Sequence, residues 1–333
     1  SKANNFTPTV STFRGPGPCD LARVANMSDP AHPRNSATNL TGPPLTPQSK
    51  RLREAVKLTK RNWRTKMGRF IVEGPQAVRE ALIHQATKKP HRATVGVEDG
   101  QTRHRPTGAI LDVWATSEAA ERHPDILEHA KAANIPIREA TSAALAELTD
   151  TVTSQDIVAI VEHIDTELPQ AITKDSKLVV VLSQVRDPGN AGTVLRVADA
   201  AGADSVIFTN SSVDVYNPKT VRATAGSLFH LPVVTGVGLP EVVELARARG
   251  LQVLAADAHP PAHDLHVPWD AGLDLSQPTT WVFGNEAWGL PEKDRKQADS
   301  AVAIPLYGQA ESLNLATAAA VCLYESARNH NYT

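Results

Sequence analysis

The chain has 333 residues, 41% of them hydrophobic, and a formal net charge of −2 at pH 7. That length can hold two ordinary domains and a tail, and no segment approaches the ~20 apolar residues of a membrane span, so we expect no membrane partner. The two cysteines, Cys19 and Cys322, are too few for a disulfide framework or a four-thiolate zinc site, and we expect no metal.

Residues 1–47 are rich in Pro, Asn, Ser, Thr and Gly and poor in apolar residues. Such a segment cannot bury enough apolar surface to offset the entropy of ordering it, which predicts a disordered N-terminal tail. The tail also lacks the charged-then-apolar pattern of a secretory signal, so we expect a cytoplasmic protein.

Residues 48–165 alternate between helical and strand patterns, which predicts a small α/β domain. Within residues 50–105, about fifteen Lys and Arg stand against about five acids, a balance typical of nucleic-acid binding, although a solvated basic face is the alternative. The candidate RNA contacts in this stretch are Lys60, Arg61 and Arg64. The expected elements are helix 49–68, strand 69–74, helix 75–85, strand 109–116, helix 117–134, strand 135–140, helix 141–150 and strand 156–164.

Residues 166–176 are polar and contain Pro169, a composition typical of a linker. Residues 177–330 then alternate short apolar runs with helical segments, which predicts a largely parallel sheet with helices on both faces. The expected strands are 178–183, 205–210, 251–257, 279–284 and 301–306.

The turn after the first of these strands reads DPGNAGTVLR, residues 187–196. Its glycines match neither the Walker loop nor the dinucleotide fingerprint, so a common phosphate loop is disfavoured. The alternative is a plain strand-to-helix turn in which Asn190 caps the helix and Gly189 provides the bend. Arg196 would then form only a weak surface pair with Asp199.

A second turn reads WVFGNEAWGLPE, residues 281–292. Gly284 would let another group approach the backbone closely, since glycine has no Cβ. Glu286 follows the carboxyl end of a strand, where open α/β sheets bind ligands. An ordinary turn with a solvated glutamate is the alternative.

A third segment, residues 303–328, runs from strand through loop into an Ala-rich helix. Ser312 would cap that helix, with Asn314 in its first turn. The helix is apolar nearly all round, which predicts burial, so polar residues at its start must find partners or line a site.

Together these segments resemble the SpoU-type (TrmH-like) ribose 2'-O-methyltransferases of the SPOUT superfamily. The shared signatures are NAGTVLR, FGNE and SLNLATAAAVCLYE, in this order. Residues 215–234 also look like the family's connecting stretch, and residues 68–82 resemble the start of the RNA-binding domain that often precedes the catalytic one.

The resemblance implies a trefoil-knotted SPOUT methyltransferase domain over residues 177–330, with residues 48–165 as the RNA substrate-binding domain. It also implies S-adenosylmethionine as cofactor and a homodimer whose active site lies near the subunit interface. The implied cofactor contacts are Gly284, Ile304, Leu306 and Leu313. The implied catalytic set is Asn190, Arg196, Glu286, Ser312 and Asn314, with Lys219 and Arg222 as further candidate RNA contacts.

The expected reaction is S-adenosylmethionine-dependent 2'-O-methylation of a ribose in RNA. A guanidinium with a pKa above about 12 is a poor base, so we predict that Arg196 stabilises the negative charge that develops on the 2'-oxygen and grips a neighbouring phosphate. Asn190, Ser312 and Asn314 would position the ribose and hold Arg196. Glu286 would orient one of these groups or pair with the arginine.

The two-domain organisation resembles ribosomal RNA methylators more than single-domain transfer-RNA enzymes, so ribosomal RNA is the expected partner and transfer RNA the alternative. A non-catalytic RNA-binding protein on the same scaffold is a further alternative. A dehydrogenase-like enzyme lacks the required glycine pattern and leaves the basic domain unexplained. Base methylation through a cysteine is disfavoured, because Cys322 lies in an apolar helix and Cys19 in the tail.

Overall fold

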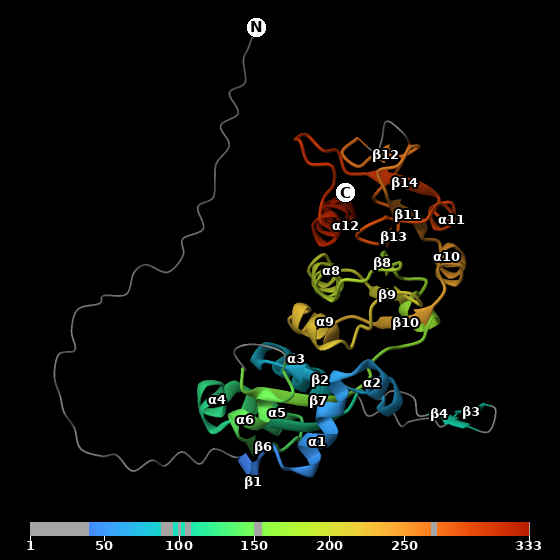
Figure 1. Ribbon diagram of the computed structural model, residues 1–333. Coiled ribbons are helices and arrows are strands. Elements are labelled where there is room, and N and C mark those ends of the chain that lie inside the picture. Colours follow the sequence, from blue (N-terminus) through green and yellow to red (C-terminus); the bar gives the residue numbers. More distant parts are fainter. Residues whose placement is uncertain are drawn as a thin grey trace, which may run out of the picture. The chain divides into compact units, whose positions relative to one another are not determined.

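The computed structural model of the chain describes residues 40–87, 96–98, 101–103, 108–149, 155–267 and 272–332. Two larger sheets follow one another along this part of the chain, each with its own helices (Figure 1). Residues 1–39 of the predicted tail lie outside the described residues. None of the helices described here is long and apolar enough to cross a membrane.

The first sheet has five strands and mixed direction. Its order is β1 (Leu40–Leu45), β6 (Ile137–Ala140), β5 (Ile110–Ala115), β7 (Ile157–Glu162) and β2 (Arg69–Glu73). Strand β7 is antiparallel to both of its neighbours, whereas β1, β6 and β5 are parallel. A separate antiparallel pair consists of β3 (Gly96–Glu98) and β4 (Gln101–Arg103).

Helices cover both faces of this sheet, because side chains alternate along a strand. Ile71 packs into one apolar cluster, and its neighbours Phe70 and Val72 pack into another. The helices of this part are α1 (Lys50–Val56), the 3₁₀ turn η1 (Lys57–Thr59), α2 (Arg61–Met67), α3 (Pro75–Thr87), α4 (Ser117–Arg122), α5 (Pro124–Ala132) and α6 (Ser142–Ala146). The expected helix 117–134 is therefore two helices, since a proline at 124 lacks the N–H that would continue the first.

Strand β1 corrects the predicted tail boundary, because residues 40–45 belong to the first sheet rather than to a tail ending at residue 47. The stretch LTGPPL contains two prolines and a glycine, which read as loop signals. An edge strand tolerates proline, since its outer N–H groups have no strand to bind. Residues 40–45 can form a strand because they lie at the edge of the sheet, and the sequence pattern does not reveal that location.

The second sheet has seven strands, all parallel to their neighbours. Its order is β10 (Val233–Val237), β9 (Ser205–Thr209), β8 (Leu178–Leu182), β13 (Thr279–Phe283), β11 (Gln252–Ala256), β14 (Ser300–Ala303) and β12 (His263–Asp264). All five predicted strands are present, but the predicted strand 301–306 ends at Ala303, and residues 304–306 begin the loop before α12. Edge strands β10 and β12 were not predicted, because one contains glycine and the other has only two residues.

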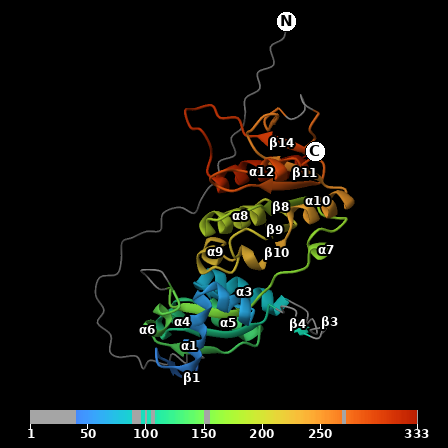
Figure 2. The same ribbon diagram turned by 45° about the vertical axis from the view of Figure 1, so that its right-hand side comes forward.

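Both faces of the second sheet carry helices, as expected (Figures 1 and 2). One face holds α8 (Pro188–Ala200), α9 (Pro218–Ala223), the 3₁₀ turn η2 (Ser227–Phe229) and α12 (Leu315–Tyr332). The other holds α7 (Leu168–Ala171) and α10 (Leu239–Ala248), and the short α11 (Glu292–Arg295) lies after β13. The predicted linker 166–176 thus contains α7, whose Leu168 and Ala171 are buried against this sheet.

Helix α8 is held against its neighbours at very close range. A Cβ on Gly192 would lie 2.4 Å from the carbonyl oxygen of Thr220 and 2.6 Å from the Cβ of Ala223, so only glycine allows α8 and α9 to approach this closely. Helix α12 packs on the other side of α8 and is anchored to β13 where the Trp281 indole N–H donates to the Ser326 hydroxyl (2.9 Å).

The expectation that α12 is buried all round is wrong for a single chain. Ala319, Cys322 and Leu323 are buried, but Tyr324 is 53% exposed. Thr317, two turns before Tyr324, and Arg328, one turn after it, are exposed as well. The face of α12 that carries Thr317, Tyr324 and Arg328 therefore lies open.

Polar contacts connect the strands and helices of residues 48–165 with those of 177–330. The Tyr216 hydroxyl accepts hydrogen bonds from the backbone N–H groups of Ile164 and Asp165, both 2.8 Å. His230, after η2, contacts Asp199 of α8 through Nδ1 (2.7 Å) and Glu80 of α3 through Nε2 (3.0 Å). A single imidazole thus bridges two carboxylates from the two parts.

The His230 bridge predicts a pH dependence of stability. Desolvation lowers the pKa of His230, but the hydrogen bonds and charges of Glu80 and Asp199 outweigh it, and the pKa is raised. The stabilisation is therefore complete below about pH 6.5, the unfolded-state value, and is lost as the pH rises through the raised folded-state pKa. The free energy of unfolding should be measured for the wild type and for His230→Gln from acid to alkaline pH. The wild type should be more stable at acid pH, and its advantage should shrink as the pH rises. A difference that stays constant with pH would contradict this assignment.

Candidate active site

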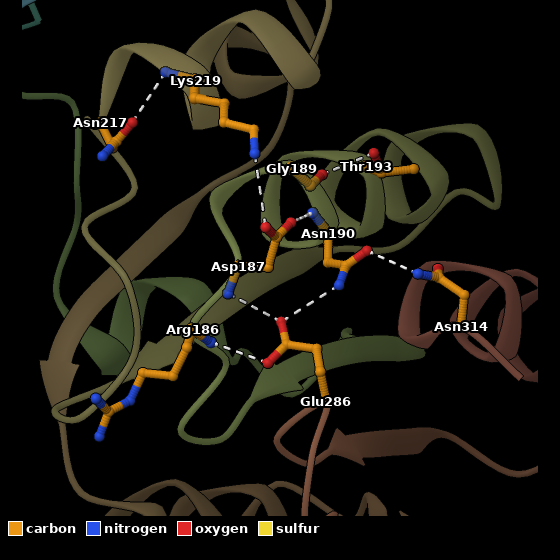
Figure 3. A network of polar contacts seen from close by, with 9 residues as sticks. All are labelled: Arg186, Asp187, Gly189, Asn190, Thr193, Asn217, Lys219, Glu286 and Asn314. Carbon is orange, nitrogen blue, oxygen red and sulfur yellow. Dashed lines mark hydrogen bonds and ion pairs between the residues drawn. The ribbon is translucent and has the colours of Figure 1, made fainter. Parts of the chain in front are cut away.

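The carboxyl ends of the parallel strands meet at one edge of the second sheet, and three loops come together there (Figure 3). The Asn314 side chain donates to Asn190 Oδ1 (3.0 Å), and Asn190 Nδ2 donates to Glu286 Oε1 (3.4 Å). One residue from each of the three sequence motifs thus takes part in a single polar network.

Glu286 joins the loop after β13 to the turn after β8. Its Oε2 accepts the backbone N–H of Arg186 (3.1 Å), and its Oε1 accepts that of Asp187 (3.0 Å). Within the described ranges, its carboxylate contacts no guanidinium. In a single chain, Glu286 thus contacts the Asn190 amide and two backbone N–H groups.

Asp187, not Asn190, caps helix α8. Its Oδ1 accepts the backbone N–H of Asn190 (2.7 Å), and Pro188 occupies the first helical position. This arrangement leaves the Asn190 side chain available for the network. The Asp-Pro pair before the helix was the available signal, since Asp is a preferred cap and Pro is favoured directly after it.

The loop after β13 folds back on itself. Asn285 and Gly289 exchange two backbone hydrogen bonds of 2.9 Å, and a Cβ on Gly284 would lie 2.4 Å from the carbonyl carbon of Gly289. The group that approaches Gly284 is therefore the backbone of its own loop. The buried Asn285 amide also donates to the Gln184 carbonyl (2.8 Å), a contact that sequence reasoning missed.

The loop before α12 exposes apolar side chains beside unpaired backbone groups. Leu306 is 41% and Leu313 36% exposed, while Ile304 is partly buried against the core. No backbone group of residues 306–312 forms a hydrogen bond within the described part of the chain. Such a loop can offer both apolar contact and backbone hydrogen bonds to a flat heterocycle.

Helix α12 is capped by Asn314 rather than Ser312. Asn314 Oδ1 accepts the backbone N–H of Ala316 (2.8 Å), while its amide donates to Asn190. Ser312 is exposed and has no hydrogen-bond partner among the described residues. An asparagine can serve both purposes because it carries an acceptor and a donor on one side chain.

Arg196 lies on the solvent face of α8 together with Thr193 and Ala200. Six residues separate it from Asn190, which places it about 9 Å further along the helix and roughly a third of a turn out of phase. Its guanidinium has no ion-pair or hydrogen-bond partner in the part of the chain described here. Within a single chain, Arg196 therefore stands outside the network of Asn190, Glu286 and Asn314.

The predicted RNA contacts differ in their surroundings. Lys60 and Arg61 are exposed, and Lys219 is exposed but lies 3.6 Å from Asp187. Arg222 pairs with Glu73 (2.9 Å) and remains partly exposed.

Arg64 departs from the expectation. Its side chain is only 3% exposed, because the guanidinium binds Asp214 and the carbonyl oxygens of Leu58 and Thr59. These internal contacts leave almost no surface for a phosphate.

The described residues hold no group of three His, Cys, Asp or Glu that could bind a metal ion. Burial raises the pKa of the Cys322 thiol to about 12. A thiol with that pKa stays protonated at neutral pH, so Cys322 cannot act as a nucleophile.

The parallel sheet and the network at its carboxyl edge define an α/β enzyme with its ligand site outside the strand ends. Residues 177–324 match the SpoU rRNA Methylase family, and residues 97–166 match the RNA 2'-O ribose methyltransferase substrate-binding family. The chain belongs to the SpoU methylase family, which confirms the resemblance drawn from its three motifs.

Two relatives cover most of the chain. It is 31% identical over 277 residues to the 23S rRNA (guanosine(2553)-2'-O)-methyltransferase RlmP of Bacillus subtilis, covering 83% of this chain and 96% of the relative. It is 33% identical over 275 residues to the 23S rRNA (uridine(2479)-2'-O)-methyltransferase of Streptomyces viridochromogenes, with coverage of 81% and 86%.

Two solved structures share the fold. The AdoMet-bound rRNA methyltransferase of Sinorhizobium meliloti aligns with a TM-score of 0.70 at 26% identity, covering 89% of this chain and 100% of that chain. The SpoU methyltransferase AviRb of Streptomyces viridochromogenes, in complex with AdoMet, aligns with a TM-score of 0.68 at 29% identity, covering 86% and 99%.

Replacing Glu286 with Gln tests whether its carboxylate holds the turn after β8 through the backbone N–H groups of Arg186 and Asp187. Glutamine keeps one acceptor but turns an N–H donor toward a backbone N–H, so either Arg186 or Asp187 loses its partner. We expect faster amide hydrogen exchange at these two residues and at least tenfold lower methyl transfer. Because Glu286 is exposed, the free energy of unfolding should fall by less than about 1 kcal/mol. Glu292→Gln, on α11, is the matched control. Lost activity with unchanged exchange would contradict the orienting role.

Proposed function

We propose that this protein transfers a methyl group from S-adenosylmethionine to the 2'-hydroxyl of a ribose in 23S ribosomal RNA, in the cytoplasm. The observation that carries the proposal is the network in which Asn190, Glu286 and Asn314 meet at the carboxyl edge of the sheet. The relatives named above as 23S rRNA 2'-O-methyltransferases support the same substrate.

The loops suit this cofactor. Exposed Leu306 and Leu313 offer apolar contact for an adenine ring, and residues 306–312 have free backbone groups for its nitrogen atoms. Gly284 holds the loop after β13 in its folded-back turn and so keeps that loop in place beside them. When bound, S-adenosylmethionine supplies an electrophilic methyl group whose departure leaves a neutral thioether, so the protein need not provide an acid.

The chain's own task is then to orient and activate the ribose hydroxyl. Asn190 and Asn314 position the sugar, and their side chains are held by a hydrogen bond to each other and by the contact of Asn190 with Glu286. The exposed Ser312 hydroxyl lies two residues before Asn314 and assists them. Arg196 stabilises the negative charge developing on the 2'-oxygen, as fixed donors do for oxyanions. The hydroxyl proton passes to phosphate or water, because the guanidinium stays charged.

Residues 48–165 act as the RNA substrate-binding domain and residues 177–330 as the methyltransferase domain, with Lys60, Arg61, Lys219 and Arg222 as RNA contacts in this proposal. The trefoil knot implied by the family is part of this proposal, and the strand order is compatible with it. Strand β13 is inserted between β8 and β11, two strands that precede it in the chain.

The function is tested by incubating the protein with labelled S-adenosylmethionine and 23S rRNA from cells that lack the gene. Label on a ribose 2'-oxygen supports the proposal, and mapping the modified position identifies the nucleotide. Label on transfer RNA instead of 23S rRNA would show that transfer RNA is the substrate. RNA binding without any transfer would favour a non-catalytic protein on this scaffold.

The protein is a homodimer in this proposal, with the open face of α12 in the interface. Tyr324, a large aromatic side chain on the open face of α12, is 53% exposed in one chain and would be covered in the interface. Sedimentation equilibrium should give twice the 35.7 kDa of one chain. Tyr324→Asp should yield monomers, whereas Glu244→Lys on α10 should not. A monomeric wild type would refute the dimer.

Arg196→Ala should lower the rate of methyl transfer by at least about 100-fold, the scale seen when one donor to a developing oxyanion is removed. Cofactor affinity, measured by calorimetry, should stay nearly unchanged. Arg196→Lys should recover only part of the rate, since an ammonium lacks the planar fork of a guanidinium. Arg249→Ala, at the end of α10, is the control. Lost cofactor binding together with retained methylation would show that the proposed role is wrong.

A further inference from the structure

A pocket of about 270 Å³ lies between α2 of the first domain and the segment from β9 to α9 of the second. Both domains contribute to its wall. The lining residues are Arg61, Arg64, Arg186, Ser211, Ser212, Val213, Asp214 and Asn217. Arg61 is one of the RNA contacts proposed above, and Arg186 contacts Glu286 through its backbone N–H.

The pocket is electropositive because its one acid is already engaged. Asp214 Oδ2 pairs with Arg64 (2.8 Å), and Asp214 Oδ1 accepts the backbone N–H of Tyr216 (2.9 Å). Arg61 and Arg186 are both exposed, and neither guanidinium has an acidic partner in the described portion of the chain. Two uncompensated guanidinium groups therefore face one small space.

Arg186 also belongs to the catalytic network, through its backbone alone. Its N–H donates to Glu286 Oε2 (3.1 Å), while its side chain points away from Glu286 (Figure 3). A group held by this side chain is thus tied directly to the turn that presents Asn190. Arg61, by contrast, begins α2 in the basic stretch of the first domain.

We propose that this pocket binds one phosphate group of the RNA backbone, gripped jointly by Arg61 and Arg186. Guanidinium forks match phosphate oxygens in geometry as well as in charge, and two of them can share one phosphodiester. The single phosphate would touch both domains, so it sets which ribose along the strand reaches the methyl-transfer site. The inference rests on the proposed RNA substrate, and it adds Arg186 as a positioning residue.

The test uses Arg61→Gln, Arg186→Gln and the double variant, with an unmodified 23S rRNA transcript as probe. Neither change removes the backbone N–H of Arg186, so the bond to Glu286 persists. Each single variant should raise the KM for RNA about tenfold, the scale of a hydrogen bond to a charged group. The kcat and the affinity for S-adenosylmethionine should stay near the wild-type values. Arg249→Gln, which removes an exposed charge on the opposite face of the second sheet, is the matched control.

The salt dependence of binding distinguishes one shared phosphate from two. On a single strand, each phosphate that the protein neutralises adds about 0.7 to the steepness of log K against log salt. The double variant should therefore be shallower by about 0.7, and its fall in affinity should be smaller than the product of the two single effects. A change near twice that slope would mean separate phosphates and would overturn the joint site, as would slopes equal to the Arg249→Gln control.

Inorganic phosphate separates an RNA site from a general anion site. Binding of free phosphate that disappears in the double variant, with no change in the RNA slope, would assign the pocket to a free anion and overturn the proposal. A wild type that methylates RNA but shows no dependence on Arg61 and Arg186 refutes the pocket alone. A wild type that binds RNA through both arginines but methylates none refutes the proposed activity alone.

Discussion

The Glu286 carboxylate crosses from the loop after β13 to the turn after β8 and accepts two backbone N–H groups there. Those two strands are neighbours in the sheet, although almost a hundred residues separate them in the chain. Because the turn that it holds carries Asn190, and Asn190 accepts a hydrogen bond from Asn314, the positions of these two amides are tied to this one acceptor. The close approach of Gly192 to Thr220 and Ala223 then fixes the rest of α8 from the other side.

The strands of the second sheet were predictable because each is a short apolar run between turn signals, as in LVVVL and TTWVF. Their order was not, since hydrophobic pattern says nothing about which run inserts between which. The same limit applies to β1, where two prolines are compatible with a strand only at an edge. Local composition predicts which secondary structure a segment can form, and the segments that pack beside it decide whether that structure forms.

The candidate site shows a similar division. The residues that meet, Asn190, Glu286 and Asn314, were all identified from motifs that end strands or begin helices. Their partners were missed, because a bond to a backbone N–H, such as that of Arg186 or Asp187, leaves no side-chain signature. Arg64 was misjudged for a related reason. Charge marks a residue as basic, but only the fold shows that Asp214 and two carbonyl groups already satisfy that charge.

Helix α8 carries polar contacts at both of its ends. Its thirteen residues form a rod about 20 Å long, with the Asn190 amide near its start, Arg196 in its middle and Asp199 near its end. His230 ties that far end to Glu80 on α3. The helix therefore fixes the spacing between the Asn190 network at its start and the His230 contacts near its end. Replacing the part of the chain that carries α3 would thus change this spacing unless the contact between His230 and Glu80 were rebuilt along with it.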